Sequence, residues 1–303
     1  MKLFKSLFSR AAGKPEPAPP QPDRWSIGIY TGDSVFNLRD PGDINPVLTA
    51  DDINDEKARL VADPFMINHE GTWYMFFEAE VESDNGPIGK IGLAVSGDGF
   101  NWAYRGMVLE EPFHLSYPYV FSFEKEIYMI PETRSDRTIR LYKATDFPFK
   151  WSFEKTLLRK RRFADNSLFR FNGLWWMFTD SGNHTLRLYY SDSPLGKWKE
   201  HRKSPILKRQ ASFARPGGRV VMVDNRPVRF AQDAFPVYGS QVWGFKITTL
   251  TPDTYEEVPV TEPIIKATGS GWNARGMHTV DPHILDGGSL LACVDGLEEK
   301  KER

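Results

Sequence analysis

The sequence carries one pattern five times: an apolar, aromatic-rich run that ends in a carboxylate. The copies read WYMFFE at 73–78, IYMIPE at 127–132, WWMFTD at 175–180, VRFAQD at 228–233 and LLACVD at 290–295. A dipeptide typical of a strand start precedes each run by a similar distance: Asp63-Pro64, Tyr117-Pro118, Asp165-Asn166, Arg215-Pro216 and Asp281-Pro282. Each interval fits two β-strands joined by a hairpin. The chain is therefore predicted to form five antiparallel strand pairs.

Two further β-runs follow each of the first four pairs. The third runs read IGLAVS at 91–96, IRLYKA at 139–144, LRLYYS at 186–191 and VWGFKI at 242–247. Shorter fourth runs lie at 107–109, 156–158, 206–207 and 263–265. Between the runs stand clusters of Gly, Pro, Asn and Asp, with almost no helical periodicity, which indicates an all-β chain. Four-stranded repeats of about 50 residues are typical of β-propeller blades.

The fifth unit ends after its second strand, and its missing half is found at the other end of the chain. Residues 25–31 read WSIGIYT, and IGIYTGDSVF at 27–36 resembles IGLAVSGDGF at 91–100. Residues 47–49 would supply the fourth strand. The N-terminal strands are thus predicted to complete the last blade of a closed five-bladed β-propeller, which leaves no open sheet edge. We predict one domain over residues 25–296.

The segments outside this domain have a different composition. Residues 1–24 are basic and proline-rich and predict a disordered tail, or alternatively a segment that binds a membrane surface or a partner transiently. Lys5 and Arg10 interrupt its apolar part, so it predicts neither a secretory signal nor a membrane span. Residues 297–303 form a charged tail. With the single Cys293 there is no disulfide framework, and we expect a cytoplasmic protein.

Charge composition limits the ligands. Lys and Arg number 39 against 40 Asp and Glu, a formal net charge of −1, so no bulk field attracts nucleic acid. No metal or cofactor motif is present, and neither a metal nor a cofactor is predicted. The sequence does not predict an oligomeric state.

In a propeller blade the first strand lines the axis and the second runs back along it, so the start of one and the end of the other share a face. The strand starts would form an inner ring of Asp63, Tyr117, Asp165, Arg215 and Asp281. The strand ends would form an outer ring of Glu78, Glu132, Asp180, Asp233 and Asp295. Any one of these acids could simply cap a turn. Gathered together, they would shift each other's pKa values, an arrangement typical of acid–base sites.

These residues resemble the five-bladed propeller glycosidases, the superfamily of arabinan- and xylan-degrading, invertase-like and mannoside-phosphorylase enzymes. The sequence is similar, more narrowly, to the N-terminal propeller domain of glucosamine inositolphosphorylceramide transferases. The motifs that carry the resemblance are ADPF at 62–65, WYMFFE, YMIPE at 128–132, FADNSLF at 163–169 and RFAQD at 229–233.

The resemblance implies roles for three positions. Asp63 matches the base or nucleophile of the glycosidases, and Asp165 matches the aspartate that holds the sugar or tunes a neighbour's pKa. The blade-four glutamate that serves as the acid is absent, because Arg215 opens that blade. We favour Glu132 as the acid, with Asp233 or Glu78 as alternatives. The remaining candidates for substrate contact are Glu78, Tyr117, Asp180, Arg215, Asp233, His278 and Asp281.

Two of these candidates have simpler interpretations. Arg215 suits an acidic or phosphorylated sugar, since guanidinium binds such anions with two hydrogen bonds, but it could instead neutralise the carboxylate ring. His278 could bond a sugar hydroxyl or shuttle a proton, or it could be an ordinary loop histidine.

The leading functional prediction is a carbohydrate-active enzyme, glycoside hydrolase-like, that acts on a glycosidic bond with paired carboxylates. The alternative is a non-catalytic glycan-binding propeller, or an accessory domain to a glycosyltransferase. A protein-interaction platform is a third hypothesis. Fold alone does not choose among them.

Overall fold

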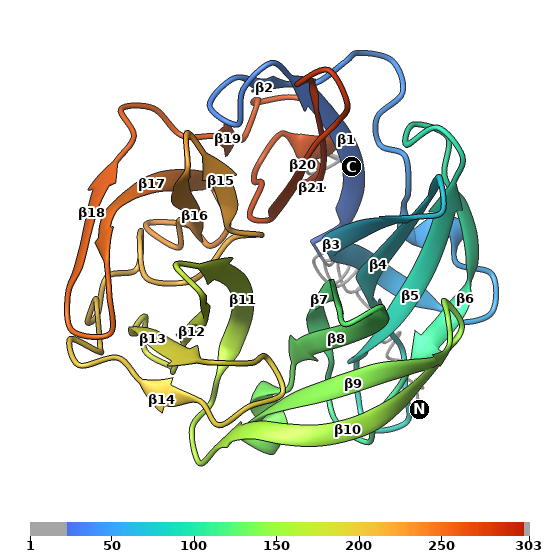
Figure 1. The fold of residues 1–303 in the computed structure, drawn as a ribbon. Helices are drawn as coiled ribbons and strands as arrows, with labels where there is room; N and C mark the ends of the chain where they lie inside the picture. Colours follow the sequence, from blue (N-terminus) through green and yellow to red (C-terminus); the bar gives the residue numbers. More distant parts are fainter. Residues whose placement is uncertain (1–22, 300–303) are drawn as a thin grey trace, which may run out of the picture.

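The computed structural model describes residues 23–299 as a ring of five antiparallel sheets around a central axis, shown in Figure 1. Blade one consists of β3 (Ala58–His69), β4 (Thr72–Val81), β5 (Ile88–Ser96) and β6 (Ala103–Leu109). Blade two consists of β7 (Ser116–Phe123), β8 (Glu126–Glu132), β9 (Thr138–Asp146) and β10 (Lys150–Arg159). In both, the first strand lies innermost. The predicted fold and its five blades are confirmed.

Blades three and four follow the same order with shorter outer strands. Blade three consists of β11 (Ala164–Phe171), β12 (Leu174–Asp180), β13 (Leu186–Ser191) and β14 (Lys199–Glu200). Blade four consists of β15 (Val221–Val223), β16 (Arg226–Gln232), β17 (Gln241–Leu250), β18 (Tyr255–Pro259) and β19 (Ile265–Lys266). Both β18 and β19 pair with β17, so the expected fourth strand of this blade is divided in two.

The last blade joins the two ends of the chain. Its inner strands are β20 (Val280–Ile284) and β21 (Leu290–Leu297), and its outer strands are β1 (Trp25–Gly32) and β2 (Leu38–Arg39). The pairing of β1 with β21 runs over the whole length of both strands, from Trp25 opposite Leu297 to Gly32 opposite Leu290. The N-terminal strand therefore closes the ring, as predicted.

The expected fourth strand of this last blade at 47–49 is only partly formed. Leu48 makes a single bridge to Ile27, while β2 provides the regular pairing. The Asn45 side chain explains the break, because its amide bonds both the N–H and the C=O of Ile29 at 2.8 Å, where a strand backbone would otherwise pair. Pro46 has no N–H to offer.

Apolar side chains fill the spaces between neighbouring blades. Phe65 of β3 packs edge-on to Tyr117 of β7, and Phe76 of β4 packs edge-on to Trp151 of β10. Three short 3₁₀ turns lie in the connections: η1 (Ala50–Asp52), η2 (Arg134–Asp136) and η3 (Gly271–Asn273). Within residues 23–299, no helix has the length and apolar character needed to cross a membrane. The two charged tails predicted at the termini lie largely outside the described residues.

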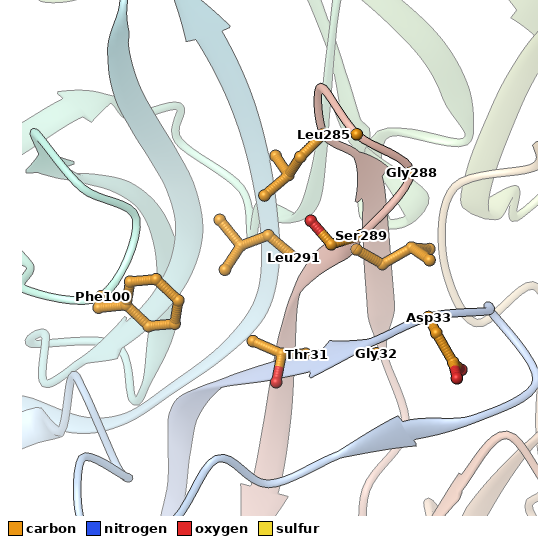
Figure 2. Close-up of a pocket in the computed structure, with 10 residues that line it drawn as sticks. Thr31, Gly32, Asp33, Phe100, Leu285, Gly288, Ser289 and Leu291 are labelled. Atoms are coloured by element: carbon orange, nitrogen blue, oxygen red, sulfur yellow. The ribbon is translucent and has the colours of Figure 1, made fainter.

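The ring has two faces. We call the face where first strands begin and second strands end the mouth face, and the other, where the first and second strands turn, the hairpin face. On the hairpin face a hollow of about 660 Å³ lies between the last blade and blade one, shown in Figure 2. It is lined mainly by small residues of the β20–β21 turn and by Phe100. It has no titratable side chain other than Asp33.

Candidate functional site

The same backbone irregularity occurs in the innermost strands of three blades. Asp63, Tyr117 and Asp165 have φ angles of 51°, 46° and 52°, in the left-handed region that residues other than glycine seldom adopt. Each lies where the register of the first strand pair shifts. A bulge of this kind turns a side chain out of the regular alternation, and such strain is concentrated at functional sites.

A cavity of about 210 Å³ opens on the mouth face beside Asp63. Four of the predicted site residues besides Asp63 line it: Glu78, Glu132, Arg215 and His278. The other lining residues are Trp25, Leu60, Ala62, His114, Ser116 and Tyr238. Pockets that enclose drug-sized ligands measure roughly 300–1,000 Å³, so this one suits a ligand the size of a single sugar ring.

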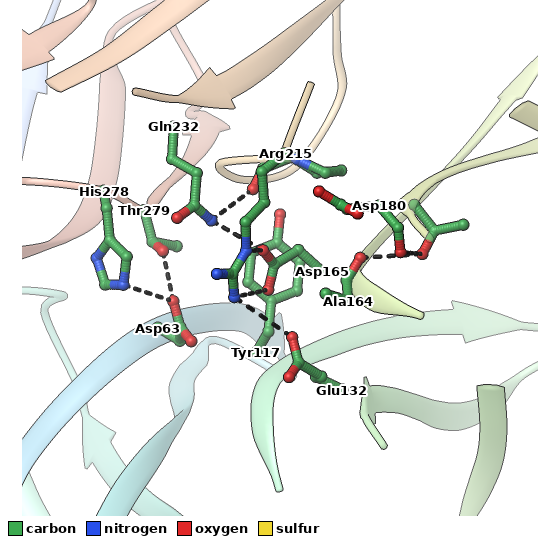
Figure 3. Close-up of polar contacts among 12 residues, drawn as sticks. Asp63, Tyr117, Glu132, Ala164, Asp165, Asp180, Arg215, Gln232, His278 and Thr279 are labelled. Atoms are coloured by element: carbon green, nitrogen blue, oxygen red, sulfur yellow. Dashed lines mark hydrogen bonds and ion pairs between the residues drawn. The ribbon is translucent and has the colours of Figure 1, made fainter. Parts of the chain in front are cut away.

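Asp63 is held by the last blade. Its Oδ1 accepts a hydrogen bond of 2.6 Å from the Thr279 hydroxyl and lies 3.6 Å from His278 Nε2. Its own N–H donates to Asp295 Oδ2 at 3.1 Å. Figure 3 shows His278 and Thr279 converging on this carboxylate. Asp63 therefore has a fixed orientation with one carboxylate edge engaged.

Arg215 connects two carboxylates on the other side of the cavity. Its Nη2 lies 3.4 Å from Asp165 Oδ1 and 3.5 Å from Glu132 Oε2, and its Nε also bonds Asp165 (Figure 3). Gln232 Nε2 donates to Asp165 Oδ2 at 2.8 Å. Asp165 is fully buried and does not line the cavity. It sits behind Arg215 as that residue's counter-ion.

Burial and mutual repulsion raise the pKa of the Asp63 and Glu132 carboxyl groups. Burial is the main cause for Asp63, whose pKa rises to about 7 with further contributions from Asp165 and Glu78, although His278 opposes the shift. The pKa of Glu132 rises to about 8 because of burial and of Asp165, while Arg215 opposes the shift. At neutral pH, Glu132 is therefore largely protonated and Asp63 is close to its midpoint.

Two histidines extend the network. His114 Nε2 lies 2.9 Å from Glu78 Oε1, and His278 Nδ1 lies 2.7 Å from Asp295 Oδ2. Burial alone would lower the pKa of both imidazoles, but Glu78 and Asp295 outweigh it and raise each pKa to about 9. These shifts favour the cationic form of both imidazoles at neutral pH, although His114 Nδ1 also accepts a hydrogen bond of 3.0 Å from the Gly89 N–H, which opposes protonation at that nitrogen.

Four predicted contact residues do not line the cavity. The buried Tyr117 hydroxyl accepts from Gly218 N–H at 2.6 Å and lies 2.9 Å from Ser167 Oγ, which ties blades two, three and four together. Asp180 accepts from the Gly182 N–H in the turn after β12.

The other two are also engaged elsewhere. Asp233 accepts from Phe235 N–H at 3.0 Å and from Gln241 Nε2 at 3.0 Å. Asp281 accepts from Met66 N–H at 2.6 Å and pairs with Arg219 and His283. Burial would raise the pKa of Asp281, but Arg219 and His283 bring it below its ordinary value. It is thus a paired anion at the contact between blades four, five and one.

Sequence reasoning missed several residues that complete the site. His114 precedes β7, Ser116 is the first residue of β7, and Tyr238 lies in the loop after β16. Gln232 and Thr279 each stand beside a residue that had been singled out, Asp233 and His278. These residues lie close in sequence to the repeated strand starts and ends, and that closeness is the signal that could have identified them. The sequence does not show which of them has its side chain toward the cavity, because that depends on the register of each blade.

Among residues 23–299, two groups of side chains have the residue types of a metal site. Asp63, His278 and Asp295 bring one ligand atom each within 4.8 Å of one another, and so do Glu78, Glu80 and His114. In both groups a carboxylate contacts the imidazole and raises its pKa, so each group forms a carboxylate–histidine ion pair in this structure.

Comparison with known proteins adds the family. A family model described as glucosamine inositolphosphorylceramide transferase 1, N-terminal, matches residues 19–297. The chain belongs to this family. A glucosamine inositolphosphorylceramide transferase 1 from Oryza sativa subsp. japonica is 38% identical over 320 residues, which cover 97% of this chain and 42% of the relative. The chain therefore spans less than half the length of that relative.

Solved structures with the same fold include glycoside hydrolases. A glycosyl hydrolase from Bacteroides ovatus has a TM-score of 0.63 at 12% identity, with 87% of this chain and 94% of that chain covered. A family 117 glycoside hydrolase from Zobellia galactanivorans has a TM-score of 0.53 at 12% identity, covering 80% of this chain and 87% of that one. At such identities the likeness establishes the shared propeller fold, and the resemblance inferred from the motifs is confirmed at that level.

Proposed function

We propose that this family member binds one sugar unit of a glycoconjugate in the mouth-face cavity and acts on its glycosidic bond. Asp63 is the base or nucleophile and Glu132 is the general acid. The observation that carries the proposal is that both carboxyl groups line one small cavity with pKa values of about 7 and 8. Two carboxyl groups that face one ligand site, at least one of them with a raised pKa, are the pattern of glycosidic bond chemistry.

The surrounding residues support these two roles. Protonated Glu132 can donate a proton to a leaving oxygen at neutral pH, since its carboxyl remains largely uncharged there. Thr279 and His278 orient the Asp63 carboxylate toward the cavity. Asp165 acts indirectly, because its charge raises the pKa of Glu132 and its carboxylate holds Arg215 in place. Trp25 offers an apolar ring of the kind that packs against sugars.

The substrate class follows from the cavity and the relatives together. The relatives' names couple glucosamine with inositolphosphorylceramide, so glycans of inositol phospholipids are the first substrates to test. An acidic or phosphorylated sugar would have to compete with Asp165 and Glu132 for Arg215, because both already contact its guanidinium.

A second candidate is a glycan-binding domain without turnover, acting beside a transferase domain. The blade-four position that the glycosidase resemblance fills with a glutamate is occupied by Arg215, and Arg215 contacts the residue proposed as the acid. The relatives are named as transferases and extend well beyond the matched region. These two observations favour binding without hydrolysis.

One experiment separates the two candidates. Release of sugar from a panel of glycosides and inositol glycolipids is measured for the wild-type chain, for Asp63→Asn and for Glu132→Gln, with Asp180→Asn as the matched carboxylate outside the cavity. General acid–base contributions are about 10²–10⁴-fold, so both cavity variants should lose activity on that scale while Asp180→Asn keeps it. Sugar binding by calorimetry with no release from any substrate supports the non-catalytic domain. Full activity of Asp63→Asn would rule out its assigned role.

A further inference from the structure

An arc of basic side chains runs along the mouth face from blade two to blade four. Its members are all exposed and come from three connections around the cavity: Arg137, Lys160, Arg161, Arg162, Lys208 and Arg209. We call this set the basic arc. The formal net charge of −1 for the whole chain conceals this local concentration.

Backbone hydrogen bonds tie parts of the arc to one another and to neighbouring loops. Lys160 N–H donates to the Arg137 carbonyl at 2.9 Å, which joins the β8–β9 loop to the connection between blades two and three. Gln210 N–H, next to Arg209, donates to the His184 carbonyl at 3.1 Å. Ala234 N–H then donates to the Ala211 carbonyl at 3.1 Å. The arc therefore leads directly into the β16–β17 loop.

The β16–β17 loop ends the arc with exposed apolar residues. Phe235 is 67% exposed and Val237 is 54% exposed, and Pro236 lies between them. We call these three residues the apolar tip. Tyr238, next in sequence, lines the cavity, and the guanidinium of Arg215 lies 5.4 Å from the centre of its ring. The apolar tip thus stands at the edge of the candidate site.

Few carboxylates neutralise the arc. Within residues 23–299 the one ion pair that involves it joins Arg161 to Glu200 at 3.9 Å. Exposed acids on the other side of the mouth face, in the connections that flank blade one and in its β4–β5 loop, include Asp51, Asp52, Glu82, Asp84 and Glu110. The face is therefore polarised, with a positive half over blades two to four.

We propose that the basic arc and the apolar tip dock the mouth face on an anionic lipid bilayer. Basic side chains near an anionic membrane surface are attracted to it, and exposed aromatic and aliphatic side chains insert at the headgroup boundary. The apolar tip favours a bilayer over a soluble polyanion, which would gain nothing from Phe235 and Val237. Docking in this way presents the cavity to headgroups at the membrane surface.

The amino-terminal sequence is consistent with this orientation. Trp25 lines the cavity, so the described part of the chain begins at the mouth face, and residues 1–22 precede it in sequence. Their sequence carries Lys2, Lys5, Arg10 and Lys14 among the apolar Leu3, Phe4, Leu7 and Phe8. The inference does not depend on catalysis, because membrane binding is measured without a glycan substrate.

The test is co-sedimentation of the full chain with vesicles of phosphatidylcholine alone or mixed with phosphatidylserine. Each basic side chain near an anionic surface strengthens binding roughly fivefold, so Arg161→Glu with Arg162→Glu should weaken binding to the mixed vesicles at least about tenfold. The matched control is Lys125→Glu with Arg170→Glu, two exposed residues of the hairpin face, which changes the net charge equally and should leave binding unchanged. Circular dichroism confirms that both double variants are folded.

A second variant tests the apolar tip. Phe235→Ser with Val237→Ser should weaken binding to the mixed vesicles while leaving the residual binding salt-sensitive. The proposal would be overturned if the wild-type chain did not bind the mixed vesicles, or if the mouth-face and hairpin-face charge variants lost vesicle binding equally. It would also be overturned if the chain bound heparin tightly while the Phe235 and Val237 changes had no effect on vesicle binding. The last result would assign the arc to a soluble polyanion.

Discussion

The guanidinium of Arg215 in blade four is paired with the carboxylate of Asp165 in blade three, with Nη2 3.4 Å from Oδ1. Arg215 stands at the blade-four position where the resemblance to propeller glycosidases leads us to expect a glutamate. It lies beside the cavity and also reaches Glu132. Arg215 therefore both neutralises the carboxylate cluster and limits how it can react.

Removal of Arg215 should lower the free energy of unfolding, because the buried Asp165 carboxylate loses its counter-ion. Arg215→Gln leaves the Asp165 carboxylate buried with Gln232 as its remaining partner, and breaking a buried pair costs about 3–5 kcal/mol. Urea denaturation at neutral pH measures the loss. The double variant Asp165→Asn with Arg215→Gln removes both charges and should regain much of the stability. Additive losses in the double-mutant cycle would mean that the two residues do not interact.

The raised pKa of Asp63 predicts how stability depends on pH. Its folded value of about 7 lies above its ordinary 3.8, so the folded state binds the proton more tightly and stability falls as pH rises through that window. Asn does not titrate. Relative to wild type, Asp63→Asn should therefore gain up to about 4 kcal/mol between pH 4 and pH 8, because each pKa unit corresponds to about 1.4 kcal/mol.

Urea denaturation at pH 4 and pH 8 checks this expectation. Glu132→Gln is the companion variant, and its gain should extend to slightly higher pH because the pKa of Glu132 is about 8. A constant difference between Asp63→Asn and wild type across this range would show that the carboxyl titrates normally in the folded protein.

The contact between His114 and Glu78 predicts an elevated histidine titration. In NMR spectra His114 should titrate near pH 9, and Glu78→Gln should move its pKa down toward 6.5, because the carboxylate charge that opposes desolvation is lost while the amide oxygen can still accept the hydrogen bond. Glu80→Gln is the matched control: Glu80 is a minor cause of the shift and pairs instead with Arg59 at 3.1 Å. Equal effects of the two variants would contradict a specific contact with Glu78.

Gly218 is required where blade four meets the last blade. Its φ is +144°, and a Cβ there would lie 1.8 Å from the Val280 carbonyl oxygen. Gly218→Ala should therefore cost about 3 kcal/mol or more in thermal denaturation, or prevent folding. Gly97→Ala is the control, since no atom lies within 4 Å of its Cβ, and it should change stability by less than about 0.5 kcal/mol. A stable Gly218→Ala variant would mean that the two blades are not in close contact.

The repeat made the fold predictable from the sequence. Each WYMFFE-like run had the length and composition of a strand and a fixed place in its unit, so blade number and N-terminal closure followed from the pattern. The fourth strands were less predictable, because they are short and their pairing is divided by side chains such as Asn45. At an outer strand the alternation of apolar residues is too short to fix the register.

The site was only partly predictable for a related reason. Asp63 and Glu132 were found because they occupy repeated positions, and both line the cavity. Tyr117 occupies an equivalent position and has a similar φ, yet its side chain is buried between blades. Equivalent backbone positions therefore differ in function according to which neighbour their side chains meet, and that depends on the packing of whole blades.

The most direct test of the proposed site is a crystal structure of the protein soaked with the sugar that calorimetry shows to bind most tightly. The account predicts one sugar ring in the mouth-face cavity, with hydroxyl groups within hydrogen-bond distance of Asp63 and Glu132 and an apolar face toward Trp25. A sugar bound elsewhere, for example in the hairpin-face hollow of Figure 2, with none in this cavity would contradict it.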